Sequence, residues 1–176
     1  MLRECEKDFP HLTVRLLLSI DRSAGEETAR ECVQLAKKFV IDEPAETGTA
    51  PYVVGVDFSG NPAGDGRFAD FEGVLGEARE LGLKLSVHCG EVKAMQAEEN
   101  ARVLAFKPER LGHCTYLSEE DLATVAASGI PVEICITSNF CTSGHYVVNQ
   151  LIHVKSLWDK GARLSFCCDD TALFAT

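Results

Sequence analysis

A histidine and a glutamate lie three residues apart directly after an apolar run of the sequence. The run LKLSVH (83–88) ends in His88, and Glu91 follows after Cys89 and Gly90. Imidazole is a frequent zinc ligand, and a carboxyl group with a raised pKa can donate a proton to a reacting base. The same spacing also occurs where a buried strand emerges into an ordinary polar loop. The pair therefore indicates a metal site only if further ligands lie nearby.

Other apolar runs are also followed by polar residues. The run 52–58 holds Asp57 near its end, and the run 110–113 ends in His113. The run 131–137 is followed by Ser138 and Asn139, and the run 162–168 by two aspartates. Taken singly, each could be a helix cap, a turn residue or a core histidine bonded to a carbonyl. Their shared position favours one common site, whose members are His88, Glu91, His113, Asp57, Asp169 and Asp170.

These residue types suit hydrolysis at an electrophilic carbon. A catalytic zinc takes about three protein ligands from histidine and carboxylate and keeps a position for water. His88 and Asp169 are the candidate ligands because both stand at strand ends. Glu91 is the candidate general acid, and His113 the candidate to hold the activated water and accept its proton. Asp170 could bind a donor group on the substrate.

Apolar runs and amphipathic stretches alternate along the chain, which predicts the α/β class. The apolar runs are typical of strands buried on both faces of a parallel sheet, and they cover 12–20, 52–58, 83–88, 110–113, 131–137 and 162–168. Between them, apolar residues recur three and four apart, which predicts helices over 26–40, 68–81, 95–106, 118–129 and 145–161. Parallel neighbours need right-handed crossovers, so repeated βαβ units follow.

A doubly wound open sheet and a (β/α)8 barrel both satisfy this alternation. Neither GxGxxG nor GxxxxGK[ST] follows any strand, so the phosphate-binding signature of a nucleotide-binding open sheet is missing. In a barrel the carboxyl ends of all strands face one mouth, where active sites are built. The polar strand ends therefore favour a barrel, and six strands predict a partial one.

Composition limits the functions of the chain. Its 176 residues, 45% hydrophobic and 25% charged, predict one globular domain over 1–176. A formal net charge of −10 without a basic cluster argues against nucleic acid as a partner. No long apolar stretch indicates a membrane span or signal peptide, which predicts a cytoplasmic protein. Most of the eight cysteines lie within apolar runs and no CxxC occurs, so we expect reduced thiols.

Five motifs together resemble the adenosine deaminase family, in the same order along the chain. They are VVGVDFSGNP (53–62), HCGE (88–91), RLGHCT (110–115), VEICITSN (132–139) and CCDD (167–170). The segments LLLSIDRS and TALFAT are similar to the adenosine-deaminase-like branch, which acts on N6-substituted purine nucleoside monophosphates. The resemblance covers nearly all of residues 12–176 and implies a barrel of the metal-dependent hydrolase type.

The resemblance also implies a set of residue roles. His88 and Asp169 would be ligands of one zinc ion, Glu91 would donate a proton to purine N1, and His113 would be the partner of the zinc-activated water. Gly60 would offer its backbone N–H to purine N3, and Asp170 would bond to N7. The implied reaction replaces the amine or alkylamine at C6 of a purine nucleoside or nucleoside monophosphate with oxygen.

The sequence departs from the family at its first strand. The family's other two zinc ligands form a His-x-His pair, and none occurs in this chain. His11, His145 and His153 are poor substitutes, because the first precedes a strand and the others lie on or beside a helix. We therefore expect a barrel without its first two strands, with apolar sheet edges at 12–20 and 162–168 that recruit foreign strands. The hypothesis is that the chain alone is inactive and aggregates or needs a partner.

A smaller departure and two alternatives complete the prediction. Cys114 stands where the family has a glycine, so a positive φ there would cost about 1 kcal/mol. A different metal-dependent barrel hydrolase, acting on an amide, lactone or phosphoester, is one alternative, and a non-catalytic, degenerate deaminase fold is the other. Release of ammonia or an alkylamine, instead of an acid, distinguishes the deaminase from the other hydrolase.

Overall fold

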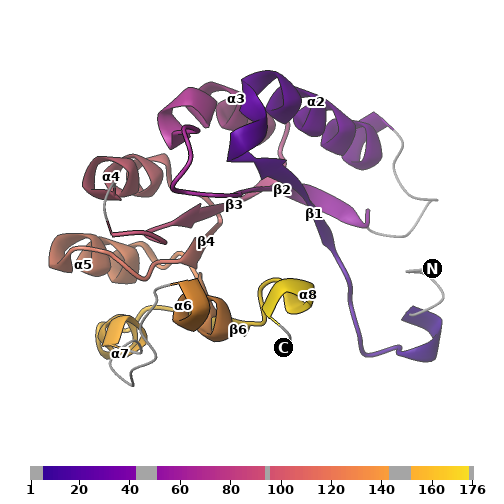
Figure 1. Ribbon diagram of the computed structural model, residues 1–176. Coiled ribbons are helices and arrows are strands. Elements are labelled where there is room, and N and C mark those ends of the chain that lie inside the picture. The colour runs from indigo at the N-terminus through magenta and orange to yellow at the C-terminus, as the bar shows by residue number, and fades with distance from the viewer. Residues whose placement is uncertain (1–5, 43–50, 94–95, 143–151, 175–176) are drawn as a thin grey trace.

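A single curved parallel sheet organises the protein (Figure 1). The computed structural model describes residues 6–42, 51–93, 96–142 and 152–174. Six strands pair in the order in which they occur along the chain, and every pair is parallel. They are β1 (Leu16–Asp21), β2 (Val53–Ser59), β3 (Lys84–Cys89), β4 (Arg110–His113), β5 (Val132–Cys135) and β6 (Leu164–Cys167). This is six strands of a (β/α)8 barrel, as predicted.

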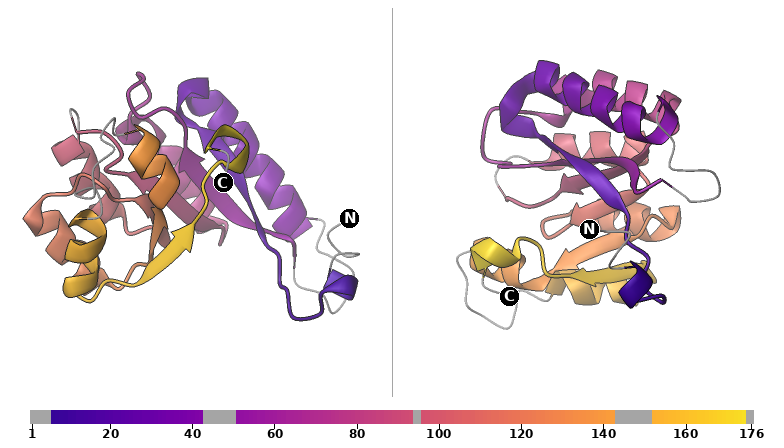
Figure 2. Two further views of the ribbon diagram at one scale, coloured as in Figure 1. Left: turned by 60° about the horizontal axis from the view of Figure 1, so that its bottom comes forward. Right: turned by 90° about the vertical axis from the view of Figure 1, so that its right-hand side faces the viewer.

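Helices connect the strands and follow the outer side of the curved sheet (Figure 2). The longer ones are α2 (Gly25–Lys37), α3 (Phe68–Glu80), α4 (Gln96–Phe106), α5 (Glu119–Ser128) and α7 (Ile152–Asp159). Short helices are η1 (Arg22–Ala24), η2 (Lys38–Asp42), α6 (Ile136–Thr142) and α8 (Thr171–Phe174). Because α6 and α8 directly follow β5 and β6, they lie at the carboxyl-terminal mouth of the sheet.

Local signals explain where the helices begin and end. The Ser118 hydroxyl caps α5 by accepting from the Asp121 backbone N–H, and Gly129 ends that helix in the left-handed region at φ 67°. Gly82, at φ 78°, follows α3 in the same way. These caps confirm the predicted boundaries within one or two residues.

Two predicted elements differ from the observed ones. The strand predicted over 131–137 ends at Cys135, and α6 begins at Ile136. Ile136 and Thr137 are apolar or β-branched and imitate a strand continuation, but Asn139 is buried by the helical turn and bonds to His113. The strand predicted over 12–20 is observed over Leu16–Asp21. The helix predicted over 145–161 is seen as α7, while residues 143–151 lie outside the described residues.

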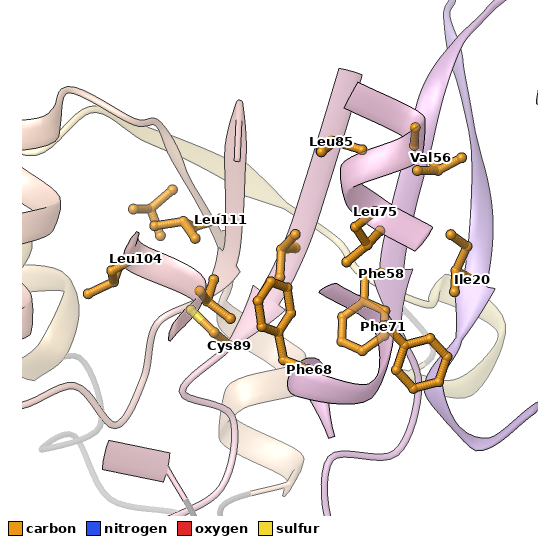
Figure 3. Close-up of a cluster of buried hydrophobic side chains, with 14 of the residues drawn as sticks. Ile20, Val56, Phe58, Phe68, Phe71, Leu75, Leu85, Cys89, Leu104 and Leu111 are labelled. Carbon is orange, nitrogen blue, oxygen red and sulfur yellow. The ribbon is translucent and has the colours of Figure 1, made fainter. Parts of the chain in front are cut away.

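The hydrophobic core lies between the sheet and its outer helices (Figure 3). Phe58 and Leu85 point outward from β2 and β3, and both are buried. Phe68 and Phe71 of α3 cover them, with the Phe58 and Phe68 rings edge to face at 5.9 Å. Truncating one such ring costs about 3–5 kcal/mol. This core fixes the strands whose ends carry the polar residues.

Both edges of the sheet are open within the described residues. β1 lies at one edge and β6 at the other. Leu16 of β1 is 40% exposed and Phe166 of β6 is 63% exposed. Each edge strand presents unpaired backbone groups, the arrangement that recruits other strands. The sequence-based expectation of two apolar edges is confirmed.

Candidate functional site

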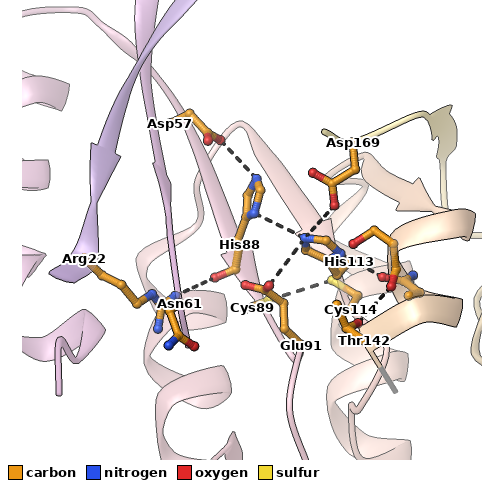
Figure 4. A network of polar contacts seen from close by, with 12 residues as sticks. Arg22, Asp57, Asn61, His88, Cys89, Glu91, His113, Cys114, Thr142 and Asp169 are labelled. Carbon is orange, nitrogen blue, oxygen red and sulfur yellow. Dashed lines mark hydrogen bonds and ion pairs between the residues drawn. The ribbon is translucent and has the colours of Figure 1, made fainter. Parts of the chain in front are cut away.

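Five polar side chains meet at the carboxyl-terminal mouth of the sheet (Figure 4). Asp57 comes from β2, His88 from β3, Glu91 from the loop after β3, His113 from the end of β4, and Asp169 from the segment after β6. Their side chains are 5–24% exposed. Four strand ends thus contribute to one half-buried cluster, as the sequence predicted.

His113 is at the centre of this cluster. Its Nε2 atom lies 3.3 Å from Nδ1 of His88, 3.6 Å from a carboxylate oxygen of Glu91 and 3.9 Å from one of Asp169. The two imidazole rings are 4.9 Å apart and nearly perpendicular. One ring nitrogen therefore faces two acids and a second imidazole, a suitable set for proton transfer and for holding a cation.

A buried amide orients the His113 ring. The Oδ1 atom of Asn139, in α6, lies 2.8 Å from Nδ1 of His113, and its Nδ2 lies 3.4 Å from Nε2 of His153. In this arrangement the His113 Nδ1–H donates to the amide oxygen, so Nε2 carries a lone pair toward the site. Asn139 and His153 are 6% and 9% exposed. His153 therefore has a buried structural contact with the Asn139 amide.

The backbone after β4 adopts an unusual conformation. His113 and Cys114 have φ values of 61° and 53°, in the left-handed region. Each such non-glycine residue costs about 1 kcal/mol or more. The Cys114 backbone N–H donates to the Cys89 carbonyl at 3.0 Å, which holds the turn against β3. From the sequence, an energetic cost is expected at Cys114 if its φ is positive, and the observed φ of 53° meets that condition.

His88 is held on two sides. Its Nε2 lies 3.4 Å from a carboxylate oxygen of Asp57. On the other side, a Cβ atom on Gly112 of β4 would lie 2.6 Å from the His88 ring, so this strand position has room only for glycine. Burial lowers the pKa of His88, but the hydrogen bond and charge of Asp57 outweigh it and the net pKa is raised. Burial conversely raises the pKa of Asp57, and contact with His88 turns the net shift downward.

A buried ion pair stabilises the end of β3, the strand that carries His88. Arg22, which follows β1, donates to Glu99 of α4 at 2.8 Å and to the His88 carbonyl oxygen at 3.4 Å. Its guanidinium lies 4.8 Å from the centre of the Phe58 ring. The Arg22 side chain is 1% exposed and that of Glu99 is 10% exposed. The strand end that carries His88 is thus tied to β1 and α4.

Gly60 and Asp170 occupy positions at the rim of the mouth. Gly60 has φ 96°, and a Cβ there would lie 2.3 Å from the Asp21 carboxylate, so both conformation and space require glycine. Asp170 accepts from the backbone N–H groups of Ala172 and Leu173, each at 3.0 Å, and caps α8. Their contacts with a purine stay predictions.

The substitute histidines do not reach the cluster in the described residues. His11 is exposed and precedes β1, at the opposite end of the sheet. His153 contacts Asn139, and His145 lies outside the described residues. Among the described residues, the cysteines form no disulfide bond with one another.

The donor atoms of the cluster fit a divalent cation. Two groups of three have their ligand atoms within 4.8 Å of one another, namely His88 with Glu91 and His113, and His113 with Cys135 and Asp169. Oxygen Oε1 of Glu91 is buried without a hydrogen-bond partner among the described residues. The predicted ligands His88 and Asp169 belong to different groups that share His113. Imidazole, carboxylate and thiol are the donors that zinc takes in proteins.

Sequence reasoning assigned no role to three residues that contribute to this site. Asn139 follows an apolar run like any loop amide, and the SN pair of VEICITSN was its only signal. Gly112 precedes His113 inside RLGH, where a glycine in a strand already indicates a close approach. Cys135 was interpreted as a small core residue, yet it shares the inner face of β5 with Glu133 two positions earlier.

Comparison with known proteins agrees with the geometry. The family model described as adenosine deaminase matches residues 1–176. The chain belongs to the adenosine deaminase family. Relatives include the adenosine deaminase-like protein of Drosophila pseudoobscura, 40% identical over 99% of this chain and 48% of the relative. N6-mAMP deaminase of Arabidopsis thaliana is 39% identical over 93% of this chain and 42% of its own length.

A solved structure of this family superposes on the sheet. Arabidopsis ADAL complexed with IMP matches with a TM-score of 0.80 and 37% identity, over 93% of this chain and 44% of the ADAL chain. A further ADAL structure holds GMP. The chain spans about half the length of the curated relatives it matches. In the described parts of the chain, every helix is too short or too polar to cross a membrane.

Proposed function

We propose that the chain carries the proton-transfer half and part of the metal site of a zinc-dependent purine deaminase. The substrate is a 6-amino- or N6-alkylaminopurine nucleoside monophosphate, and the product is the 6-oxo purine. The observation that carries the proposal is the meeting of Glu91, His88 and Asp169 around Nε2 of His113. Family membership supports the reaction class, and the IMP and GMP bound to Arabidopsis ADAL support a nucleotide ligand.

The residues divide the chemistry between them. A zinc ion held by His88 and Asp169 would supply Lewis-acid activation of the water nucleophile. His113, with its Nε2 lone pair facing the site, takes the proton from that water as the oxygen adds to C6. Glu91 donates a proton to ring nitrogen N1, which makes C6 more electrophilic. The protonated His113 then gives its proton to the amine as the C6–N bond breaks. The C6 hydroxyl returns a proton to the Glu91 carboxylate, which leaves the 6-oxo product.

Two further residues would orient the purine. The Gly60 backbone N–H lies at the end of β2 and would donate to N3. Asp170 would bind at N7 through whichever oxygen its helix-capping contacts leave available. A ring held at N3 and N7 presents N1 and C6 to the acid and the nucleophile together, the kind of orientation that accounts for several kcal/mol of a barrier.

The catalytic set within this chain is incomplete relative to the family pattern. The family's His-x-His pair is absent from the sequence, so the ligand set implied by the resemblance reduces to His88 and Asp169. Two ligands hold zinc far more weakly than four, and the open edges at β1 and β6 favour self-association. We therefore expect little or no turnover by the chain alone.

The test compares the chain with a chimera. In the chimera, the part of the Drosophila pseudoobscura relative that precedes its matched region is fused ahead of residue 1, to supply the His-x-His pair expected of the family. Both proteins are loaded with zinc and incubated with N6-methyl-AMP and AMP, and IMP and the released amine are quantified by chromatography. We expect IMP only from the chimera, and none after Glu91→Gln.

Two results would contradict these expectations. A folded, zinc-loaded chimera that releases neither methylamine nor ammonia refutes the proposed reaction. A monomer of the chain alone that turns over N6-methyl-AMP refutes the expectation of impaired activity and leaves the reaction standing.

A further inference from the structure

The His113 ring is linked to a second buried histidine through the side chain of Asn139. Nδ1 of His113 lies 2.8 Å from the amide oxygen of Asn139, and the amide nitrogen lies 3.4 Å from Nε2 of His153. His113, Asn139 and His153 are 4%, 6% and 9% exposed. They come from the end of β4, from α6 and from α7. The contacts therefore connect the mouth of the sheet with a helix that supplies no other residue of the site.

An amide cannot by itself decide which nitrogen of a histidine carries the ring proton. Its oxygen accepts a hydrogen bond and its NH2 group donates, and the two ends have nearly the same shape. With the oxygen toward His113, the ring donates from Nδ1 and Nε2 keeps a lone pair. With the NH2 group toward His113, Nδ1 must accept and the ring proton moves to Nε2. The tautomer of His113 therefore depends on what fixes the Asn139 amide.

His153 is the group at the other end of that amide. A neutral imidazole with a bare Nε2 accepts only from the NH2 group of Asn139, so the amide oxygen turns to His113. His113 then donates from Nδ1, and its Nε2 lone pair faces Glu91 and Asp169 (Figure 4). Each hydrogen bond of the chain thus fixes the direction of the next one.

We propose that His153 is a positioning residue, which acts through Asn139 to hold His113 in the tautomer whose Nε2 can accept a proton. The inference rests on the proposed function, because the tautomer matters to the reaction only if His113 is the proton acceptor. Such control has a large effect elsewhere. In serine proteases, a change behind the histidine base that leaves it in the wrong tautomer lowers kcat about 10⁴-fold.

NMR spectroscopy tests the inference without substrate or turnover. Long-range proton–nitrogen correlation spectra of the full, chelator-treated chain report which ring nitrogen of each histidine carries the proton. They are recorded at about pH 8.5, above the ordinary histidine pKa of about 6.5, and each ring is assigned from a variant that lacks it. In the wild type we expect the proton on Nδ1 of both His113 and His153.

Two variants of matched shape separate the role of His153 in hydrogen bonding from its role in packing. An ionised glutamate only accepts hydrogen bonds, whereas a glutamine can turn either end of its amide toward Asn139. We expect His153→Glu to keep the single Nδ1–H form of His113, and His153→Gln to produce a mixture of the two tautomers. His11→Gln, which changes an exposed histidine ahead of β1, is the control and should leave the spectrum of His113 unchanged.

A further variant tests the chain of contacts without altering His153. Asn139→Asp replaces the amide with a carboxylate that accepts at both ends. His113 should keep its proton on Nδ1, whereas Nε2 of His153 should gain a proton. The dispersion of the backbone amide signals shows whether each variant is folded, and Asn139→Asp decides the question if both substitutions at position 153 unfold the chain.

Three results would overturn the inference. They are a wild-type His113 with its proton on Nε2, a single tautomer of His113 that persists in folded His153→Gln, and an Nε2 of His153 that stays bare in Asn139→Asp. The chimera assay judges the deamination separately. A chimera without turnover refutes the reaction and leaves the measured tautomers as they are.

Discussion

The two halves of the site differ in how firmly the chain holds them. His88 and His113 come from the central strands β3 and β4, and each is braced by buried contacts, to Gly112 and Asp57 for the first and to Asn139 for the second. Asp169 follows the edge strand β6, whose Phe166 is largely exposed. The proposed proton acceptor His113 and the proposed metal ligand His88 are thus preorganised, whereas the other proposed metal ligand, Asp169, follows a strand with no neighbour on one side among the described residues. The difference follows from the number of strands that flank each position.

The largest expected effect concerns the braced half. Arg22→Met leaves the Glu99 carboxylate buried without its cation, and removing one partner of such a pair costs about 3–5 kcal/mol of unfolding free energy. Urea denaturation followed by circular dichroism measures the loss. The double variant Arg22→Met/Glu99→Gln should recover most of it. Arg30→Met, which breaks the exposed pairs of Arg30 with Glu26 and Glu77, is the control and should leave the midpoint nearly unchanged.

The next effect tests the fit between β4 and His88. Gly112→Ala places a methyl group against the His88 ring, and overpacking of this kind costs about 1–3 kcal/mol. Because the ring must move, zinc affinity should fall with stability. Gly73→Ala, in the open on α3, should instead stabilise by about 0.5–1 kcal/mol. Equal stability of the Gly112→Ala variant and the wild type would show that His88 is not held as described.

A pH effect should distinguish the contact between Asp57 and His88 in chelator-treated protein. The pKa of folded His88 is raised, so its contribution to stability is full below its unfolded pKa of about 6.5 and is lost as pH rises through the folded pKa. The pKa of folded Asp57 is lowered, so its contribution is present above its unfolded value of about 3.8 and is lost as pH falls through the folded pKa. The pair therefore stabilises most in mildly acidic solution. Asp57→Asn should flatten the pH profile of the urea midpoint.

The smallest effect on stability belongs to the edge. Phe166→Lys on β6 replaces an exposed ring with a charge, and surface changes of this kind usually alter stability by no more than about 0.5 kcal/mol. Association through the strand edge should nevertheless fall, because charged residues protect natural edges. Light scattering against protein concentration measures this. If self-association is unchanged, the surface responsible is not the β6 edge. Leu16→Lys on β1 is then the next variant to compare.

The sequence predicted the parallel strands and the strand-end position of the site because both depend on local pattern. Continuous apolar runs identify parallel strands, and the carboxyl ends of parallel strands meet at one mouth. His88, Glu91, His113 and Asp169 could therefore be grouped before any distance was known. The family resemblance then supplied roles that pattern alone leaves open.

The remaining features depend on contacts between distant residues. The turn of Ile136 into α6 is decided by burial of Asn139 against His113, since local propensity favoured a longer strand. The orientation of Cys135 toward His113 depends on the register of β5 between its neighbours. The left-handed conformation of His113 occurs beside the backbone hydrogen bond from Cys114 to Cys89, a contact between two strands that no single-residue preference predicts.

The strictly sequential order of the six strands has a consequence for biogenesis. Each strand pairs only with the strands before and after it along the chain, so every β–α unit can dock as soon as it has left the ribosome. Native contacts then form between segments a few tens of residues apart, and no late strand has to insert between two earlier ones. Synthesis can therefore assemble the Arg22, His88 and His113 region while β6 is still inside the exit tunnel, which makes the edge the last part of the site to be built.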